Sequence, residues 1–115
     1  MDLTKERIIQ EYVPGKQVTI AHVIPNPDPS LYRKLGVVGD LSGALGIMTI
    51  TPSEGAIIGA DVAVKAADVE IVFVDRFSGS LVITGSTAAV EAAVREVNSV
   101  LQETMQFTPC TISRS

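Results

Sequence analysis

The sequence predicts an α+β fold, a ferredoxin-like α/β sandwich in which two helices pack on one face of an antiparallel sheet. Three observations predict it. Short runs rich in Val, Ile and Thr are separated by Gly- and Pro-containing breaks, which is typical of strands. Two longer stretches repeat apolar residues at helical spacing. Two of the strands are joined by a short connection that suits a β-hairpin. With 115 residues, the chain has the size of a single domain.

The first half of the chain is expected to hold two strands and a short helix. Gln17–Ile24 is β-branched and roughly alternating, and the prolines that follow it must end the strand. A short helix is expected at Ser30–Leu35, with Ser30 as its N-cap and Gly36 as its stop. Ala44–Thr51 is almost continuously apolar, which predicts a second, central strand.

The second half reads as helix, hairpin and helix. Thr51-Pro52-Ser53-Glu54 has the pattern of a capping box, which predicts Thr51 as the N-cap of a helix that runs to about Ala67. Glu70–Val74 and Ser80–Thr84 form the hairpin. Ser86 is expected to cap the last helix, which ends near Glu103. Within it Glu91 and Arg95 have the spacing of an ion pair. The tail from Phe107 onwards has no assigned structure.

The composition excludes several classes of protein. Hydrophobic residues make up 46% of the chain and charged residues 19%, with a net charge of −4 and one cysteine. A disordered chain and a disulfide framework are thereby excluded, and the apolar runs are too short to span a membrane. The N-terminus lacks the apolar core of a signal peptide, and no nucleic-acid partner is expected. So small a domain cannot bury this much apolar surface, which predicts an oligomer.

The residues form no known catalytic or metal-binding pattern. A single cysteine excludes a thiolate zinc or iron–sulfur cluster, and no phosphate-binding glycine motif occurs, so no cofactor or metal is expected. We interpret His22 as a packed or hydrogen-bonded structural residue and Cys110 as a small apolar filler. The alternative is a nucleophilic pair of the two. Asp75 and Arg76, taken alone, are solvated charges in a turn.

Three segments carry a resemblance to a known family: QEYVPGKQVTIAHVIPNP at 10–27, DVAVKAADV at 61–69 and EIVFVDRFSGSLVITG at 70–85. They resemble bacterial microcompartment shell proteins, of the circularly permuted, single-domain hexameric type found in ethanolamine- and propanediol-utilisation compartments. The resemblance runs from about Glu6 to Arg114. It implies an N-terminal extension at 1–15 followed by a permuted BMC domain at 16–115.

The resemblance implies a shell tile and not an enzyme. The expected partners are further copies in a homohexamer, other shell proteins and encapsulated enzymes, and the expected location is the microcompartment shell in the cytoplasm. Two alternatives come from other classes: a ferredoxin-like regulator that senses a small molecule, and a small enzyme that uses His22 or Cys110. A hexamer would support the tile, and a dimer or trimer the regulator.

The resemblance also implies functional residues. The hairpin tip would line a pore on the six-fold axis, through Asp75, Arg76, Phe77, Ser78, Gly79 and Ser80. Unless Asp75 neutralises it, a ring of Arg76 side chains would favour anions. Phe77 has a second interpretation, as packing at the subunit interface. Lys65 would lie at the edge where hexamers meet. The alternative interpretation is that Lys65 is simply an exposed lysine at a helix end, favoured by the helix dipole.

The N-terminal extension would form a six-stranded barrel over one mouth of the pore. Six short strands related by symmetry can close without a free edge. Because glutamates inside a narrow barrel would repel, Ile8, Gln10 and Tyr12 are expected to point inward. A further expectation falls on Gly43, whose backbone freedom would permit a bent or locally asymmetric ring.

Overall fold

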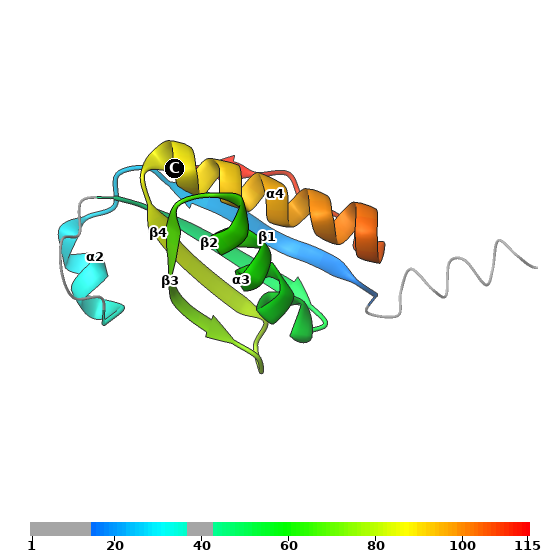
Figure 1. Ribbon diagram of the computed structural model, residues 1–115. Coiled ribbons are helices and arrows are strands. Elements are labelled where there is room, and N and C mark those ends of the chain that lie inside the picture. Colours follow the sequence, from blue (N-terminus) through cyan, green and yellow to red (C-terminus); the bar gives the residue numbers. More distant parts are fainter. Residues whose placement is uncertain (1–14, 37–42) are drawn as a thin grey trace, which may run out of the picture.

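The computed structural model describes residues 15–36 and 43–115 as one five-stranded sheet with three helices (Figure 1). The sheet order is β3-β4-β2-β1-β5. The strands are β1 (Gln17–Ile24), β2 (Ala44–Thr51), β3 (Val69–Asp75), β4 (Ser80–Gly85) and β5 (Ser113–Arg114). The helices are α2 (Pro29–Lys34), α3 (Glu54–Ala66) and α4 (Thr87–Met105). The first four strands pair antiparallel, and β5 joins β1 in parallel.

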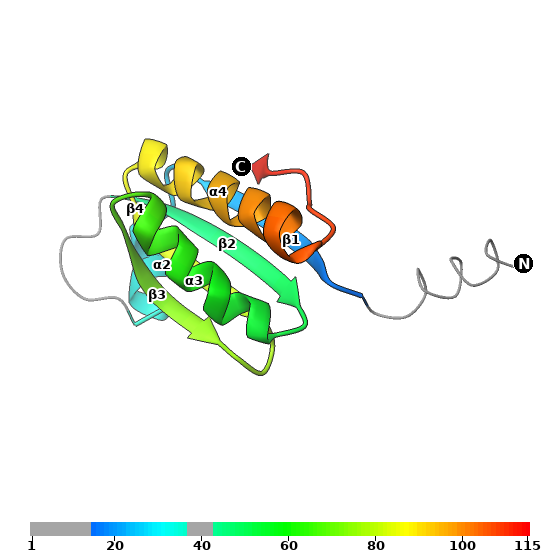
Figure 2. The same ribbon diagram turned by 45° about the vertical axis from the view of Figure 1, so that its right-hand side comes forward.

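The two long helices cover one face of the sheet, and the short helix α2 lies on the other (Figures 1 and 2). The predicted α+β class, the common face for both long helices and the four predicted strands are thus confirmed. Among the described residues, no helix combines the length and apolarity that a membrane crossing requires.

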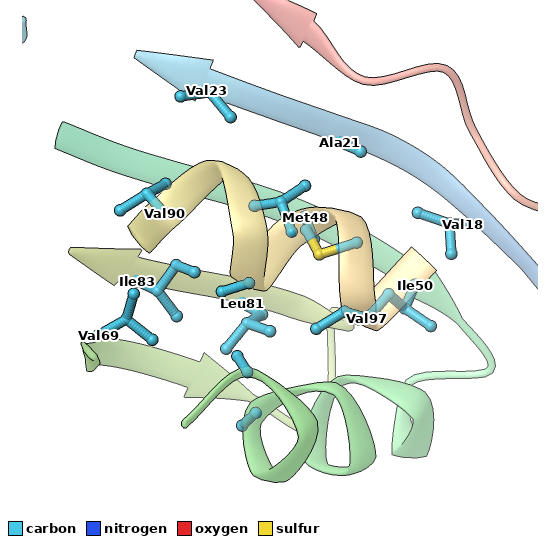
Figure 3. Close-up of a cluster of buried hydrophobic side chains, with 14 of the residues drawn as sticks. Val18, Ala21, Val23, Met48, Ile50, Val69, Leu81, Ile83, Val90 and Val97 are labelled. Carbon is cyan, nitrogen blue, oxygen red and sulfur yellow. The ribbon is translucent and has the colours of Figure 1, made fainter. Parts of the chain in front are cut away.

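The main core lies between the sheet and the helices α3 and α4 (Figure 3). A second, smaller core on the opposite face is formed by Tyr32 of α2 with Leu45 and Val82. Strand β2 is therefore covered on both faces, which explains why its sequence is continuously apolar instead of alternating. Each large aliphatic side chain buried this way contributes about 1.5–3 kcal/mol relative to an exposed one.

Two predicted helix starts are wrong. Asp28, and not Ser30, caps α2, because its carboxylate accepts the Ser30 N–H at 2.8 Å and Pro29 takes the first helical position. Thr51 does not cap α3. It is the last residue of β2, paired with Gln17, and Ser53 takes the cap position without a side-chain hydrogen bond. Strand pairing outweighed the local capping signal. Ser86 does cap α4, through the Ala89 N–H.

The chain after α4 is ordered beside β1, which the sequence did not indicate. It ends in the two-residue strand β5. This return also corrects the expected Glu91–Arg95 pair: within 15–36 and 43–115, Glu91 instead lies 3.4 Å from Arg114, which the returning chain places over α4.

Candidate functional site

The turn between β3 and β4, residues Asp75–Ser80, is called the hairpin tip below. Its shape is fixed by Asp75, whose carboxylate accepts the Phe77 N–H and whose carbonyl accepts the Gly79 N–H, both at 2.8 Å. The bond from Phe77 and a second from the Ser78 hydroxyl lower the pKa of Asp75, so its carboxylate is charged at neutral pH. The tip is a turn closed by its own first residue.

Gly79 is required for reasons inside one chain. Its φ of +79° is left-handed, and a Cβ there would collide with the Ile50 carbonyl oxygen. Its own carbonyl accepts the Ile50 N–H at 2.9 Å, which joins the tip to the end of β2. Gly79 is accordingly buried, whereas Arg76, Phe77 and Ser78 are exposed.

Arg76 and Phe77 form the outermost part of the tip. The guanidinium lies over the aromatic ring, 4.9 Å from its centroid, and Phe77 is 82% exposed. The ion pairs of the described residues are Lys65–Asp61 and Arg114–Glu91, so Arg76 has no carboxylate partner among them. Asp75 carries the opposite charge, but its carboxylate is bonded within the turn, and the exposed guanidinium of Arg76 lies beside the ring outside the ion pairs of the described residues.

An apolar surface runs from the tip along α3 and β3. Ile57, Val74 and Phe77 line a shallow hollow together with Asp75 and Arg76. Ile71 and Val74 pair with Ile83 and Leu81, which lie in the main core, so they are on the helix-facing side of the edge strand. We call this set the apolar edge; it comprises Ile57, Val64, Ile71, Val74 and Phe77, all exposed. A monomer would leave these side chains in water, which marks the edge as a contact surface.

Lys65 lies near the end of α3 and is exposed. Its ammonium group is 2.8 Å from the Asp61 carboxylate, one turn earlier. A solvated pair of this kind contributes at most about 1 kcal/mol to stability, so the fold itself does not require Lys65.

Gly43 lies where three parts of the chain meet. Its carbonyl accepts a hydrogen bond from the hydroxyl of buried Tyr32, and a Cβ at Gly43 would collide with the backbone of Gly85. A glycine is therefore needed at position 43 because of the close approach to Gly85, and not because of a positive φ. The barrel residues Ile8, Gln10 and Tyr12 lie outside the described residues.

His22 and Cys110 are both engaged by the end of the chain. His22 bonds Ser113 and Ser115 through its two ring nitrogens, at 2.6 and 2.8 Å, so the predicted hydrogen bonding of this side chain is present. The Cys110 thiol lies 3.6 Å from the Thr19 carbonyl and packs against the core. No group of three metal-ligating side chains occurs within 15–36 and 43–115.

Comparison with known proteins defines the class. Residues 44–114 match the BMC domain. The chain is 55% identical over 112 residues to the bacterial microcompartment shell protein PduU of Salmonella typhimurium, covering 97% of this chain and 96% of that protein. It is 54% identical over 113 residues to the shell protein EutS of Escherichia coli, covering 98% of this chain and all of EutS. A flat hexamer of CutR superposes with a TM-score of 0.84 at 44% identity, covering 95% of this chain and 99% of that one.

The chain therefore belongs to the BMC-domain family of bacterial microcompartment shell proteins. It is a structural subunit of a microcompartment shell, as the resemblance in its sequence predicted. The hairpin tip and the apolar edge are its candidate functional surfaces.

Proposed function

We propose that the chain forms cyclic hexamers that tile with other shell proteins, and that the hairpin tip lines the six-fold axis. The observation that carries this proposal is the flat hexamer of CutR, to which the chain is 44% identical over nearly its whole length. A closed ring needs two different surfaces on each subunit, one facing each neighbour. The apolar edge supplies one of them.

We infer that the domain is circularly permuted. The BMC match begins at residue 44, the first residue of β2, and leaves β1 and α2 before it. Yet β1 lies beside β2 in the sheet. If β1 is counted after α4, the order becomes β-α-β-β-α-β, the ferredoxin-like order. The permutation leaves residues 1–15 ahead of the domain, where they would supply the barrel strand over the pore through Ile8, Gln10 and Tyr12.

We propose that the pore favours small anions. Arg76 is exposed and lacks a carboxylate partner among the described residues, while the turn holds the Asp75 carboxylate. A ring would repeat this arrangement in every subunit, with the exposed guanidinium groups toward the axis and the oppositely charged, half-buried Asp75 carboxylates set back in the turns. Phe77 would both support Arg76 and contact the neighbouring subunit, since its ring lines the hollow of the apolar edge. Gly79, by contrast, would face β2 and not the channel.

Lys65 and Gly43 have further proposed roles. Lys65, exposed and dispensable for the fold, would contact the next hexamer. Gly43 would allow a bent ring, because it lies in close contact with Gly85, at the junction between the end of β4 and the start of β2. A test of the bend by substitution must allow for the collision with Gly85, which disturbs the subunit as well as the ring.

We propose that the chain has no catalytic activity and that its partners are shell proteins and encapsulated enzymes. Both ring nitrogens of His22 are occupied by serine hydroxyls, and Cys110 lies against backbone carbonyls and not against an imidazole. Native mass spectrometry of the full chain tests the assembly. A hexamer is expected, and a dimer or trimer would instead favour the small-molecule regulator.

Cysteine cross-linking tests where the tip lies. In a Cys110→Ser background, Ser78→Cys should yield disulfides between subunits of one hexamer, because a tip on the axis brings six copies together. Glu96→Cys, on the exposed side of α4, is the matched control and should give none. Hexamers in which Ser78→Cys cross-links no better than Glu96→Cys would place the tip away from the axis.

A further inference from the structure

The segment after α4, residues 106–115, covers the free edge of β1, and we call it the strap. Figure 2 shows it turning back from the end of α4 and running beside β1. It begins at Gln106, which has a left-handed φ of 58° and reverses the chain. Among the described residues, the strand at the opposite edge of the sheet, β3, pairs with β4 alone, and we call it the bare edge.

The first half of the strap is held by burial. Phe107 is 3% exposed and belongs to the main core. Next to it, the Thr108 N–H donates to the Lys16 carbonyl at 2.8 Å, and the Thr108 carbonyl accepts the Val18 N–H at 2.9 Å. The strap thus pairs with the start of β1 and is anchored there by an aromatic side chain.

A side chain of α4 fixes the middle of the strap. The Asn98 amide donates to the Cys110 carbonyl at 2.8 Å and accepts the Cys110 N–H at 3.2 Å. The side-chain amide of Asn98 therefore takes the place of a neighbouring strand for both backbone groups of Cys110. Both backbone groups of Cys110 are satisfied without β1, so the contact with Asn98 is a boundary between two parts of the strap.

The second half is held mainly by exposed polar contacts. Ser113 and Ser115 bond the two nitrogens of His22, and the Ser115 N–H donates to the Val23 carbonyl at 3.1 Å. Arg114 reaches Glu91 at 3.4 Å in a partly solvated pair. Its apolar contribution comes from Ile112, which is only partly buried. Segments with few buried apolar contacts have the lowest free energies of local opening.

We propose that the strap is an edge guard in two parts. Residues 106–110 stay docked, while 111–115 open on their own and uncover the edge of β1 around Ala21–Val23. An uncovered edge strand offers a row of unpaired N–H and C=O groups to any other strand. The guard keeps this edge closed during assembly.

The strand that would pair with an open β1 edge is β3 of a second copy. It is the bare edge of the same sheet, and it exposes Ile71, Phe73 and Val74 on its two faces. Joining β1 of one copy to β3 of the next uses two different surfaces at opposite ends of one sheet. Such a head-to-tail contact, when it does not close, builds open filaments instead of rings. The guard therefore protects ring formation from a competing polymer.

Truncation after Cys110 tests the proposal in the otherwise complete chain. By light scattering at equal concentration, the truncated chain should have a mean mass at least about tenfold that of the full chain. This mean mass should rise further with protein concentration. Adding Ile20→Lys to the truncated chain places a charge on the exposed side of β1 and should reverse this growth. Equal masses for the full and truncated chains would overturn the guard. Growth that Ile20→Lys leaves unchanged would overturn pairing through β1.

Hydrogen exchange on the full chain tests the two-part opening without any substitution. The Thr108 amide should exchange at least about 100-fold more slowly than the Ser115 amide, after correction for their intrinsic rates, because Phe107 anchors only the first half. The Ser113→Ala/Ser115→Ala variant should lower the protection of the backbone amide at position 115 and leave that of Thr108 unchanged. Equal protection of the two amides would show that the strap opens as one unit.

Discussion

The two edges of the sheet differ in how they meet the surroundings. The β3 edge is bare, and the apolar side chains of α3 and β3 beside it remain in water. The β1 edge is covered by the strap, whose backbone and serine hydroxyls bond the edge strand and its histidine. Two bare edges would polymerise without limit, and two covered edges would leave little surface for a neighbour. The difference withholds β1 from strand pairing with other copies and leaves the apolar edge as one of the two surfaces that a ring needs.

The largest effect is expected from a charge placed on the apolar edge. Ile57→Lys would bury an ammonium group at every subunit contact, at a cost of about 3–5 kcal/mol per contact if it finds no partner. Because a ring repeats the contact, native mass spectrometry should show monomers where the parent chain shows hexamers.

Ile20→Lys is the matched control, since Ile20 on β1 is 48% exposed and Ile57 on α3 is 50% exposed. It should leave the hexamer intact. If both substitutions dissociate the ring, or neither does, the two edges do not have the different roles described above.

The next largest effect concerns the anchor of the covered edge. Phe107→Ala should lower the free energy of unfolding by about 3–5 kcal/mol, since it leaves a cavity in the main core. Urea unfolding at one fixed protein concentration measures it. Ile112→Ala, in the partly buried second half of the strap, should cost clearly less. Equal losses would contradict the division of the strap into an anchored and a loose half.

The sequence predicted the strands at both edges of the sheet but not the strap that covers one of them. The strands and long helices follow from periodicity, and the hairpin from its apolar strands and short turn. The strap has no such pattern, because its order depends on partners distant in the sequence, among them Asn98 and His22. The capping signal at Thr51 failed for the same reason: pairing with Gln17 holds it in β2. The residues of the tip came from the resemblance, whereas the roles of Gly79 and Asp75 within the turn needed the structure.

A smaller effect is expected at the tip, where the bare edge ends. The Phe77 N–H, and then the Ser78 hydroxyl, lower the native pKa of Asp75 below the unfolded value of about 3.9. The charged carboxylate therefore stabilises the fold above that value, and this contribution is lost as pH falls through the lower native pKa. Asp75→Asn should be less stable than the parent at pH 7, with the gap closing at lower pH. Thermal unfolding across this range measures it, and a gap that is constant with pH would contradict the role of the charge.

The smallest effect on stability is expected for Lys65→Ala. Lys65 and Asp61 are 73% and 60% exposed, so their pair contributes about 0.5 kcal/mol or less. Hexamers should persist, while the sheets and shells seen by electron microscopy should be lost. Asp61→Ala removes the same pair but keeps the lysine, and should preserve the sheets. Normal sheets from Lys65→Ala would exclude the contact between hexamers.

The central claim is that the bare edge joins subunits in a ring whose axis is lined by the hairpin tip. An electron cryomicroscopy reconstruction of the assembled full chain tests it most directly. It should show six subunits, with Ile57 and Val74 against a neighbour, Arg76 near the axis and the strap still paired with β1 of its own chain. A ring joined through β1, or an assembly with the tip on its outer rim, would contradict the account.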